Sequence, residues 1–160
     1  MIRAYKEVND DLLYFHIWEE DETNAVFYQG AMGNVGELEH VSAKTPDELT
    51  DIINKKIDEL NNTDWSGIDD DEYDVLIIEY KIDGDGAEKD HEKRQAVQEK
   101  MNEILGLTGV GWCDGGSIGD GTMEICCVVF DYQLAYDIIN EDLNETEFED
   151  FSRIYVESER

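Results

Sequence analysis

Residues 106–131 have the sequence Gly-Leu-Thr-Gly-Val-Gly-Trp-Cys-Asp-Gly-Gly-Ser-Ile-Gly-Asp-Gly-Thr-Met-Glu-Ile-Cys-Cys-Val-Val-Phe-Asp. Seven of the chain's thirteen glycines lie here, and the most apolar run of the protein, residues 125–130, follows them. Glycine adopts backbone angles that other residues reach only with strain. A glycine cluster before a β-branched apolar run favours a tight loop that leads into a buried strand. We therefore predict that residues 109–114 and 122–130 pair as a hairpin, with residues 115–121 as its loop.

A β-α-β-β-α-β order surrounds this hairpin in the second half of the chain. The expected elements are a strand at 73–82, a helix at 88–105, the hairpin, a helix capped by Asp131 and a strand at 153–157. This order resembles that of the ferredoxin-like split βαβ fold. The resemblance covers residues 75–160 and implies that the first and third strands are central, with both helices on one face of the sheet. It concerns strand order only and implies nothing about iron or electron transfer.

The strand at 125–130 is apolar on both of its faces. One face carries Ile125, Cys127 and Val129, and the other carries Cys126, Val128 and Phe130. Only one set can meet the two helices, and a monomer rarely leaves a large apolar patch in water. We therefore predict that both sets are largely buried, the second by the N-terminal part of the chain or by a second copy in a homodimer.

The first half of the chain has the pattern of an antiparallel meander followed by one helix. Strands are predicted at 2–8, 12–18, 25–28 and 38–41. The helix begins with Thr45 as its cap, Pro46 as its first residue and Glu48 as its third, which forms a capping box. A stripe at helical spacing provides its buried face: Leu49, Ile52, Ile53, Ile57 and Leu60. The helix is expected to end at residues 61–62, with Trp65 and Ile68 folding back onto it.

Three glycines at three-residue intervals separate the third and fourth strands. The segment at residues 29–36 is Gln-Gly-Ala-Met-Gly-Asn-Val-Gly. This spacing, with four strands and a Pro-capped helix, resembles the WGR domain, whose signature is Trp-Gly-Arg-x-Gly-x-x-Gly. In the poly(ADP-ribose) polymerases that carry this domain, the tryptophan and arginine help to grip nucleic acid. Those positions are Gln29 and Ala31 here. The resemblance therefore implies the fold, but the two residues that contact nucleic acid in the family are not present.

The two halves together predict an α+β protein with two domains. Residues 1–68 form the WGR-like β-sheet plus helix domain, residues 69–74 an acidic linker, and residues 75–160 the ferredoxin-like α+β domain. The linker begins with three aspartates and a glutamate, a charge run that is typical of a solvated connection.

Charge is the strongest global feature of the sequence. Forty-one acidic residues face twelve basic ones, which gives a formal net charge of −29. Such a field repels phosphate backbones and anionic lipids and attracts basic surfaces. We therefore expect a basic protein as partner and no direct binding to DNA or RNA near physiological salt. Solubility alone is the other interpretation of this charge.

Composition also predicts a cytoplasmic protein with no membrane segment. No run approaches the roughly 18 apolar residues that indicate a membrane-spanning helix. The N-terminus lacks the basic and apolar stretches of a secretory signal. The three cysteines, an odd number with two adjacent, argue against a disulfide framework and for a reducing compartment.

Several short motifs fail the tests for a metal or a cofactor. A calcium loop starting at Asp83 would lack the required oxygen ligand, glycine and glutamate at its fifth, sixth and twelfth positions. The glycine-rich segment opens onto a strand and contains no base, unlike a phosphate loop. Cys126 and Cys127 point to opposite faces of a strand and cannot bind one ion, so they and Cys113 are expected to be inert thiols. We expect no cofactor, no metal and no catalytic residue.

Four residues of the hairpin form a hypothetical binding interface: Trp112, Asp114, Asp120 and Glu124. Trp112 either packs against Met123 across the hairpin or anchors a partner, because tryptophan is enriched at interface hot spots. The three acids are candidates for paired carboxylates in acid–base chemistry. In so acidic a chain, chance proximity explains them better.

These observations favour a non-enzymatic, strongly acidic cytosolic protein of bacteria that binds or blocks a basic protein partner. Immunity proteins and nucleic-acid mimics use this physics, in which electrostatic steering precedes contact through a few buried anchors. A WGR-like accessory module of a nucleic-acid-processing complex is the first alternative, and an enzyme of unknown type is the second.

Overall fold

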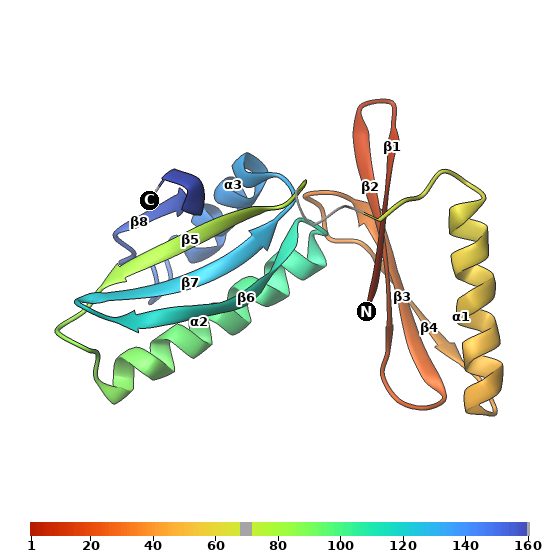
Figure 1. The fold of residues 1–160 in the computed structure, drawn as a ribbon, viewed down its shortest axis with the longest axis horizontal. Helices are drawn as coiled ribbons and strands as arrows, with labels where there is room; N and C mark the ends of the chain where they lie inside the picture. Colours follow the sequence, from red (N-terminus) through yellow and green to blue (C-terminus); the bar gives the residue numbers. More distant parts are fainter. Residues whose placement is uncertain (68–71, 160) are drawn as a thin grey trace. The chain divides into compact units, whose positions relative to one another are not determined.

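The computed structural model of the protein describes residues 1–67 and 72–159. The chain divides into two compact units, Met1–Asp69 and Asp70–Arg160. Within the described residues each unit contains one four-stranded antiparallel sheet, with one α-helix in the first unit and two in the second (Figure 1). The fold class is therefore α+β, as the sequence predicts.

The first sheet is a meander in chain order. Its strands are β1 (Ile2–Val8), β2 (Asp11–Glu19), β3 (Asn24–Ala31) and β4 (Glu37–Ser42), hydrogen-bonded in the order β1-β2-β3-β4. Asn9 and Asp10 join the first two strands, and both have positive φ, as a tight two-residue hairpin turn requires. The four predicted strands are thus confirmed, each a residue or more longer at its ends except β1.

Helix α1 (Pro46–Asn61) covers one face of this sheet (Figure 1). The Thr45 hydroxyl accepts a hydrogen bond from the Glu48 amide at 3.2 Å, as predicted. The Glu48 carboxylate accepts from the Lys44 amide at 2.8 Å, one residue earlier than an ideal capping box would have it. Buried residues of the helix and sheet form one core: Ala4, Phe15, Ile17, Ala25, Phe27, Leu49, Ile53 and Leu60. Trp65 packs against this core, and Ile68 lies outside the described residues.

The three-glycine segment is held against the face of the sheet opposite α1. The Tyr14 hydroxyl donates to the Asn34 carbonyl at 3.0 Å, and the Gly36 amide donates to the Tyr28 hydroxyl at 2.7 Å. A Cβ atom on Gly36 would clash with the Gln29 carbonyl oxygen and the Tyr14 hydroxyl. Gly33 has φ 88°, a left-handed conformation that favours glycine. The glycine spacing is therefore explained by the close packing of this turn on two tyrosines.

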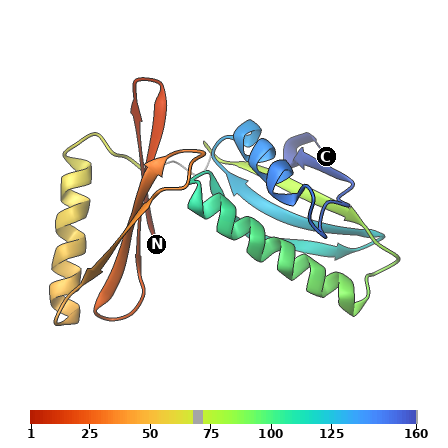
Figure 2. The ribbon, with the colours of Figure 1, turned by 180° about the vertical axis from the view of Figure 1, so that it is seen from behind.

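The second unit alternates strands and helices in the predicted order. It contains β5 (Asp74–Lys81), α2 (Glu88–Leu107), β6 (Gly111–Gly119), β7 (Thr122–Val129), α3 (Tyr132–Leu143), β8 (Arg153–Val156) and the short helix η2 (Glu157–Glu159). The strand order is β6-β7-β5-β8, so the first and third strands are central. Helices α2 and α3 lie on the same face of the sheet, which is seen most clearly from behind (Figure 2). Of the predicted linker, residues 69–71 lie outside the described residues and Asp74 already belongs to β5.

The hairpin of the second unit differs from its prediction in one respect. We expected residues 115–121 to be a loop, but β6 continues to Gly119 and the turn consists of Asp120 and Gly121 alone. Both turn residues have positive φ, the conformation for which Asp-Gly is strongly preferred in two-residue hairpins. Four other glycines of the cluster, Gly111, Gly115, Gly116 and Gly119, lie within β6, where a bulge interrupts the ladder between Cys113 and Gly116. The glycine cluster therefore marks a bulged strand, and the Asp-Gly pair is the turn signal.

The two sets of side chains on β7 are buried to different degrees. Ile125, Cys127 and Val129 are fully buried on the side of the helices. Cys126, Val128 and Phe130 are partly exposed. The predicted burial is thus complete for the first set and partial for the second, and its cover by the first unit or a second copy stays a prediction.

Candidate functional site

The face of the second sheet opposite α2 and α3 carries a connected network of polar side chains. We call it the helix-free face; it includes Glu79 of β5, Glu124, Cys126 and Val128 of β7, Trp112 and Ser117 of β6, and Arg153 and Tyr155 of β8. These side chains share the face because they are cross-strand partners or stand at alternate positions of one strand.

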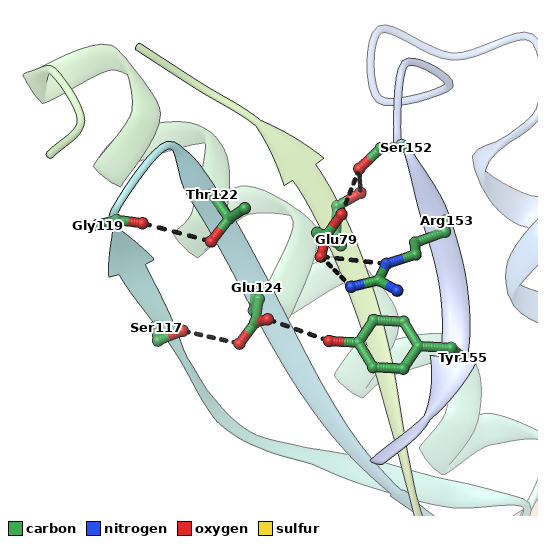
Figure 3. A network of polar contacts seen from close by, with 8 residues as sticks. All are labelled: Glu79, Ser117, Gly119, Thr122, Glu124, Ser152, Arg153 and Tyr155. Carbon is green, nitrogen blue, oxygen red and sulfur yellow. Dashed lines mark hydrogen bonds and ion pairs between the residues drawn. The ribbon is translucent and has the colours of Figure 1, made fainter. Parts of the chain in front are cut away.

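Two buried carboxylates lie opposite each other on the helix-free face. Glu79 and Glu124 are direct cross-strand partners in the β5–β7 ladder, with 7% and 4% of their surface exposed. Like charges in this position destabilise a sheet, and buried charges persist only when they are paired or hydrogen-bonded. Each glutamate has its own set of partners, and the strands on either side of the central pair supply them (Figure 3).

Glu79 is compensated by residues at the start of β8. Its Oε2 accepts hydrogen bonds from the Arg153 guanidinium, at 2.8 Å from Nη2 and 3.2 Å from Nε. Its Oε1 accepts from the Ser152 hydroxyl at 3.0 Å. The bonds from Arg153 lower the pKa of this carboxyl below its ordinary value, and the bond from Ser152 adds to them against the opposing effect of burial. Glu79 is therefore held as a charged group.

The Glu124 carboxylate accepts hydrogen bonds from two hydroxyl groups, one from each edge strand of the sheet. Its Oε2 accepts from the Ser117 hydroxyl of β6 at 3.0 Å, and its Oε1 accepts from the Tyr155 hydroxyl of β8 at 3.1 Å (Figure 3). The Arg153 guanidinium lies 4.1 Å from the centre of the Tyr155 ring, so the two halves of the network touch through a cation–π contact. All four strands therefore contribute to one connected set of polar groups.

Aromatic rings gather at the other end of the helix-free face. Tyr73 contacts Trp112 edge to face, with ring centres 5.1 Å apart, and Phe130 with centres 6.5 Å apart. All three side chains are half-buried. Trp112 stands opposite Val128 in the ladder, four residues along β7 from Glu124 and on the same face. The face thus combines a half-buried aromatic cluster with a buried acidic network.

The structure separates the four residues that the sequence singled out. Trp112 and Glu124 share the helix-free face, whereas Asp114 lies exposed in the bulge and Asp120 lies exposed in the turn. Packing of Trp112 on Met123 is the wrong one of the two alternatives, because Met123 pairs with Ile118 beside the turn and lies on the face of the sheet that α2 and α3 cover, whereas Trp112 pairs with Val128 on the other face. In the β5–β7 ladder, the carboxylate opposite Glu124 is that of Glu79.

Sequence reasoning missed Glu79, Arg153 and Tyr155. One signal was present: Glu79 is a charged residue inside a strand that is otherwise apolar on both faces. A charge in that position indicates a buried partner. The partners themselves come from β8, more than seventy residues later in the chain, and no local pattern links them.

Both carboxylates serve as hydrogen-bond acceptors within the sheet. Each of the four carboxylate oxygens of Glu79 and Glu124 accepts a hydrogen bond from a side chain of the same sheet or of the residue before β8. Neither carboxylate is therefore directed at an open site. Within residues 1–67 and 72–159, no three His, Cys, Asp or Glu side chains are grouped as metal ligands would be. None of the helices in this part of the chain is long and apolar enough to cross a bilayer.

No protein-family model, curated protein or solved structure matches the chain.

Proposed function

We propose that the protein is a non-enzymatic, strongly acidic interaction protein that binds or blocks a basic protein through the helix-free face of its second sheet. The observation that carries this proposal is the half-buried aromatic cluster of Tyr73, Trp112 and Phe130 on a protein with net charge −29. A cytoplasmic setting belongs to the same proposal.

Charge and aromatic surface have separate roles in this proposal. The field of the whole chain raises the encounter rate with a cationic surface and disfavours anionic partners. Affinity after encounter depends on a few anchors that lose water, and tryptophan and tyrosine are the residues most enriched there. In this proposal Trp112 is the anchor, and Asp114, which is exposed in the bulge two residues away, adds negative charge beside it.

Affinity capture followed by titration tests the proposal. The full chain is immobilised, a lysate of its native host is passed over it, and each captured protein is identified, purified and titrated at increasing salt. We expect a partner with a basic surface whose affinity falls with salt. Trp112→Ala should weaken the affinity for this partner roughly tenfold or more, as hot-spot truncations do. Tyr136→Ala, an exposed aromatic on α3, is the matched control and should bind like the parent protein.

Two results would overturn the proposal. One is the absence of any captured partner with a basic surface. The other is a captured partner whose affinity is the same for the parent protein and Trp112→Ala, while the circular dichroism of the variant shows it to be folded.

A WGR-like accessory module is the second candidate, favoured by the meander, the Pro-capped helix and the tightly packed three-glycine turn of the first unit. A surface pocket of about 370 Å³ lies at this turn, and its lining includes Gln29, Ala31 and Glu37 but no lysine or arginine. Neutralising the charge of nucleic-acid phosphates at this pocket would need such bases. A gel shift at micromolar protein that weakens with added salt would favour this candidate; we expect none.

A further inference from the structure

Two of the three cysteines meet across the β6–β7 hairpin. Cys113 and Cys127 are direct cross-strand partners, and their Sγ atoms lie 3.0 Å apart, closer than two sulfur atoms in van der Waals contact. Neighbouring Cys126 points to the opposite face of the sheet. We propose that Cys113 and Cys127 are a thiol–disulfide pair, which a small-molecule disulfide such as glutathione disulfide oxidises to an intramolecular bond.

Backbone geometry favours this bond. The Cys113 amide donates to the Asn102 side chain of α2 at 3.1 Å, so it is not donated to Cys127 across the ladder. In a pair of this non-hydrogen-bonded kind, the two Cα atoms are about 4.5 Å apart and the side chains approach most closely. That separation lies within the range of about 4.4–6.8 Å that disulfides span. The β6 bulge begins directly after Cys113, which gives the strand room to adjust.

The two thiols differ in their access to an oxidant. Cys113 is partly exposed, whereas Cys127 is fully buried. The contact with Cys113, together with burial, raises the pKa of the Cys127 thiol well above its ordinary value. Cys113 is therefore the thiol that meets the oxidant first, and Cys127 is the thiol that resolves the intermediate.

The reaction proceeds in two balanced exchange steps. The Cys113 thiolate, formed by loss of its proton to water, attacks one sulfur of glutathione disulfide and expels one glutathione thiolate. This leaves a mixed disulfide between Cys113 and glutathione. The Cys127 thiol then loses its proton and attacks the Cys113 sulfur, which expels the second glutathione. The protein loses two hydrogens, one glutathione disulfide becomes two glutathione thiols, and an excess of reduced glutathione reverses both steps.

Mass spectrometry of the full chain tests the pair. The folded protein is incubated with glutathione disulfide, free thiols are alkylated in denaturant, and peptides are mapped. We expect a monomer lighter by two hydrogen atoms, one peptide cross-link between Cys113 and Cys127, and alkylation at Cys126 alone. Because a hairpin cross-link restricts the unfolded chain, the oxidised protein should also have a higher Tm, which returns to its original value after reduction.

Variants in which one cysteine is replaced by serine sharpen this test. Cys126→Ser should form the same bond, whereas Cys113→Ser should remain without it under the same conditions. Three results would each overturn the proposal: a cross-link that involves Cys126, alkylation of all three cysteines after the folded parent protein has been incubated with glutathione disulfide, or bonds found only between chains. Because oxidation of the parent protein is mapped directly, the conclusion does not depend on the folding of any variant.

Discussion

In each of the two sheets, the face opposite the helices buries polar groups, but the kind of group that is buried differs. Both sheets have four antiparallel strands with helices on the other face, yet the first buries aromatic rings around one histidine and the second buries two carboxylates. On the first face, His16 lies against Tyr5 and Tyr14, with ring centres 5.9 and 5.1 Å away. Within the described residues, its Nε2 atom has no hydrogen-bond partner.

The difference shows that a partner, more than burial, decides whether a group keeps its charge. Burial of His16 among aromatic rings, with nearby Arg3 adding repulsion, lowers its pKa from 6.5 to about 4, so it is neutral at pH 7. Glu79 is also buried, but the Arg153 guanidinium lowers its pKa, so it is ionised. The face of the first sheet therefore excludes charge and that of the second stabilises it, and a separate set of predictions follows for each face.

Protonation of His16 should produce the largest effect. Because its folded pKa lies below its unfolded value, the unfolded chain binds the proton first, and stability is complete above pH 6.5 and falls as pH drops toward 4. At about 1.4 kcal/mol for each pKa unit, the loss is about 3 kcal/mol. Urea unfolding across this range should show the loss in the parent protein and not in His16→Phe. His40→Asn, which changes a histidine with a side chain 66% exposed, should keep it. An equal pH dependence in the parent and His16→Phe would contradict the account of the first face.

Gly36→Ala should come next, because it disturbs the turn that packs on Tyr14 and Tyr28. The added Cβ meets a backbone carbonyl that has little freedom to move, so we expect a loss of roughly 2–3 kcal/mol in the free energy of unfolding. Gly106→Ala in α2 is the control: outside the neighbouring residues and the backbone of α2, no atom lies within 4 Å of the added Cβ, and alanine favours a helix. The control should be neutral or slightly more stable in the same denaturant titration. Equal stability of Gly36→Ala and the parent would show that the turn does not need glycine there.

Tyr155→Phe probes the second face. It removes the hydroxyl that donates to the buried Glu124 side chain at 3.1 Å, and a buried acceptor left without its donor costs about 1 kcal/mol or more. Thermal and urea unfolding should show a loss of about this size. Tyr136→Phe, on the exposed part of α3, should remain within about 0.5 kcal/mol of the parent. If both variants lose equal stability, the network does not support Glu124.

Acid titration of Glu79 should have the smallest effect on stability, because the Arg153 side chain is half-exposed and water screens its ion pair with Glu79. With a folded pKa below its ordinary value of 4.5, Glu79 contributes stability that is complete above pH 4.5 and is lost as pH falls through the folded value. Glu79→Gln should flatten the pH dependence of unfolding below 4.5 only, and the exposed control Glu103→Gln should not. A change confined to the pH range of His16 would refute the separation of the two faces.

Local signals predicted the elements of both units because each is set by a few neighbouring residues. Thr45, Pro46 and Glu48 begin α1 as expected, and the Asp131 carboxylate accepts from the Leu134 amide at 3.0 Å to cap α3. The apolar runs of β5 and β7 predicted the two central strands of the second sheet. Capping and periodicity act within one or two turns of chain, so the sequence alone determined these elements.

Register and long-range pairing were decided only by the tertiary structure. Trp112 and Ser117 are five residues apart, so a regular strand would place them on opposite faces. The bulge between Cys113 and Gly116 inserts one extra residue and brings both to the helix-free face. The same register sets Cys113 opposite Cys127, and the position of β8 brings Arg153 to Glu79. The sequence by itself determined the order of strands and helices and the charge of the chain. The tertiary structure decided which side chains meet, because one residue's shift in register moves every later side chain to the other face.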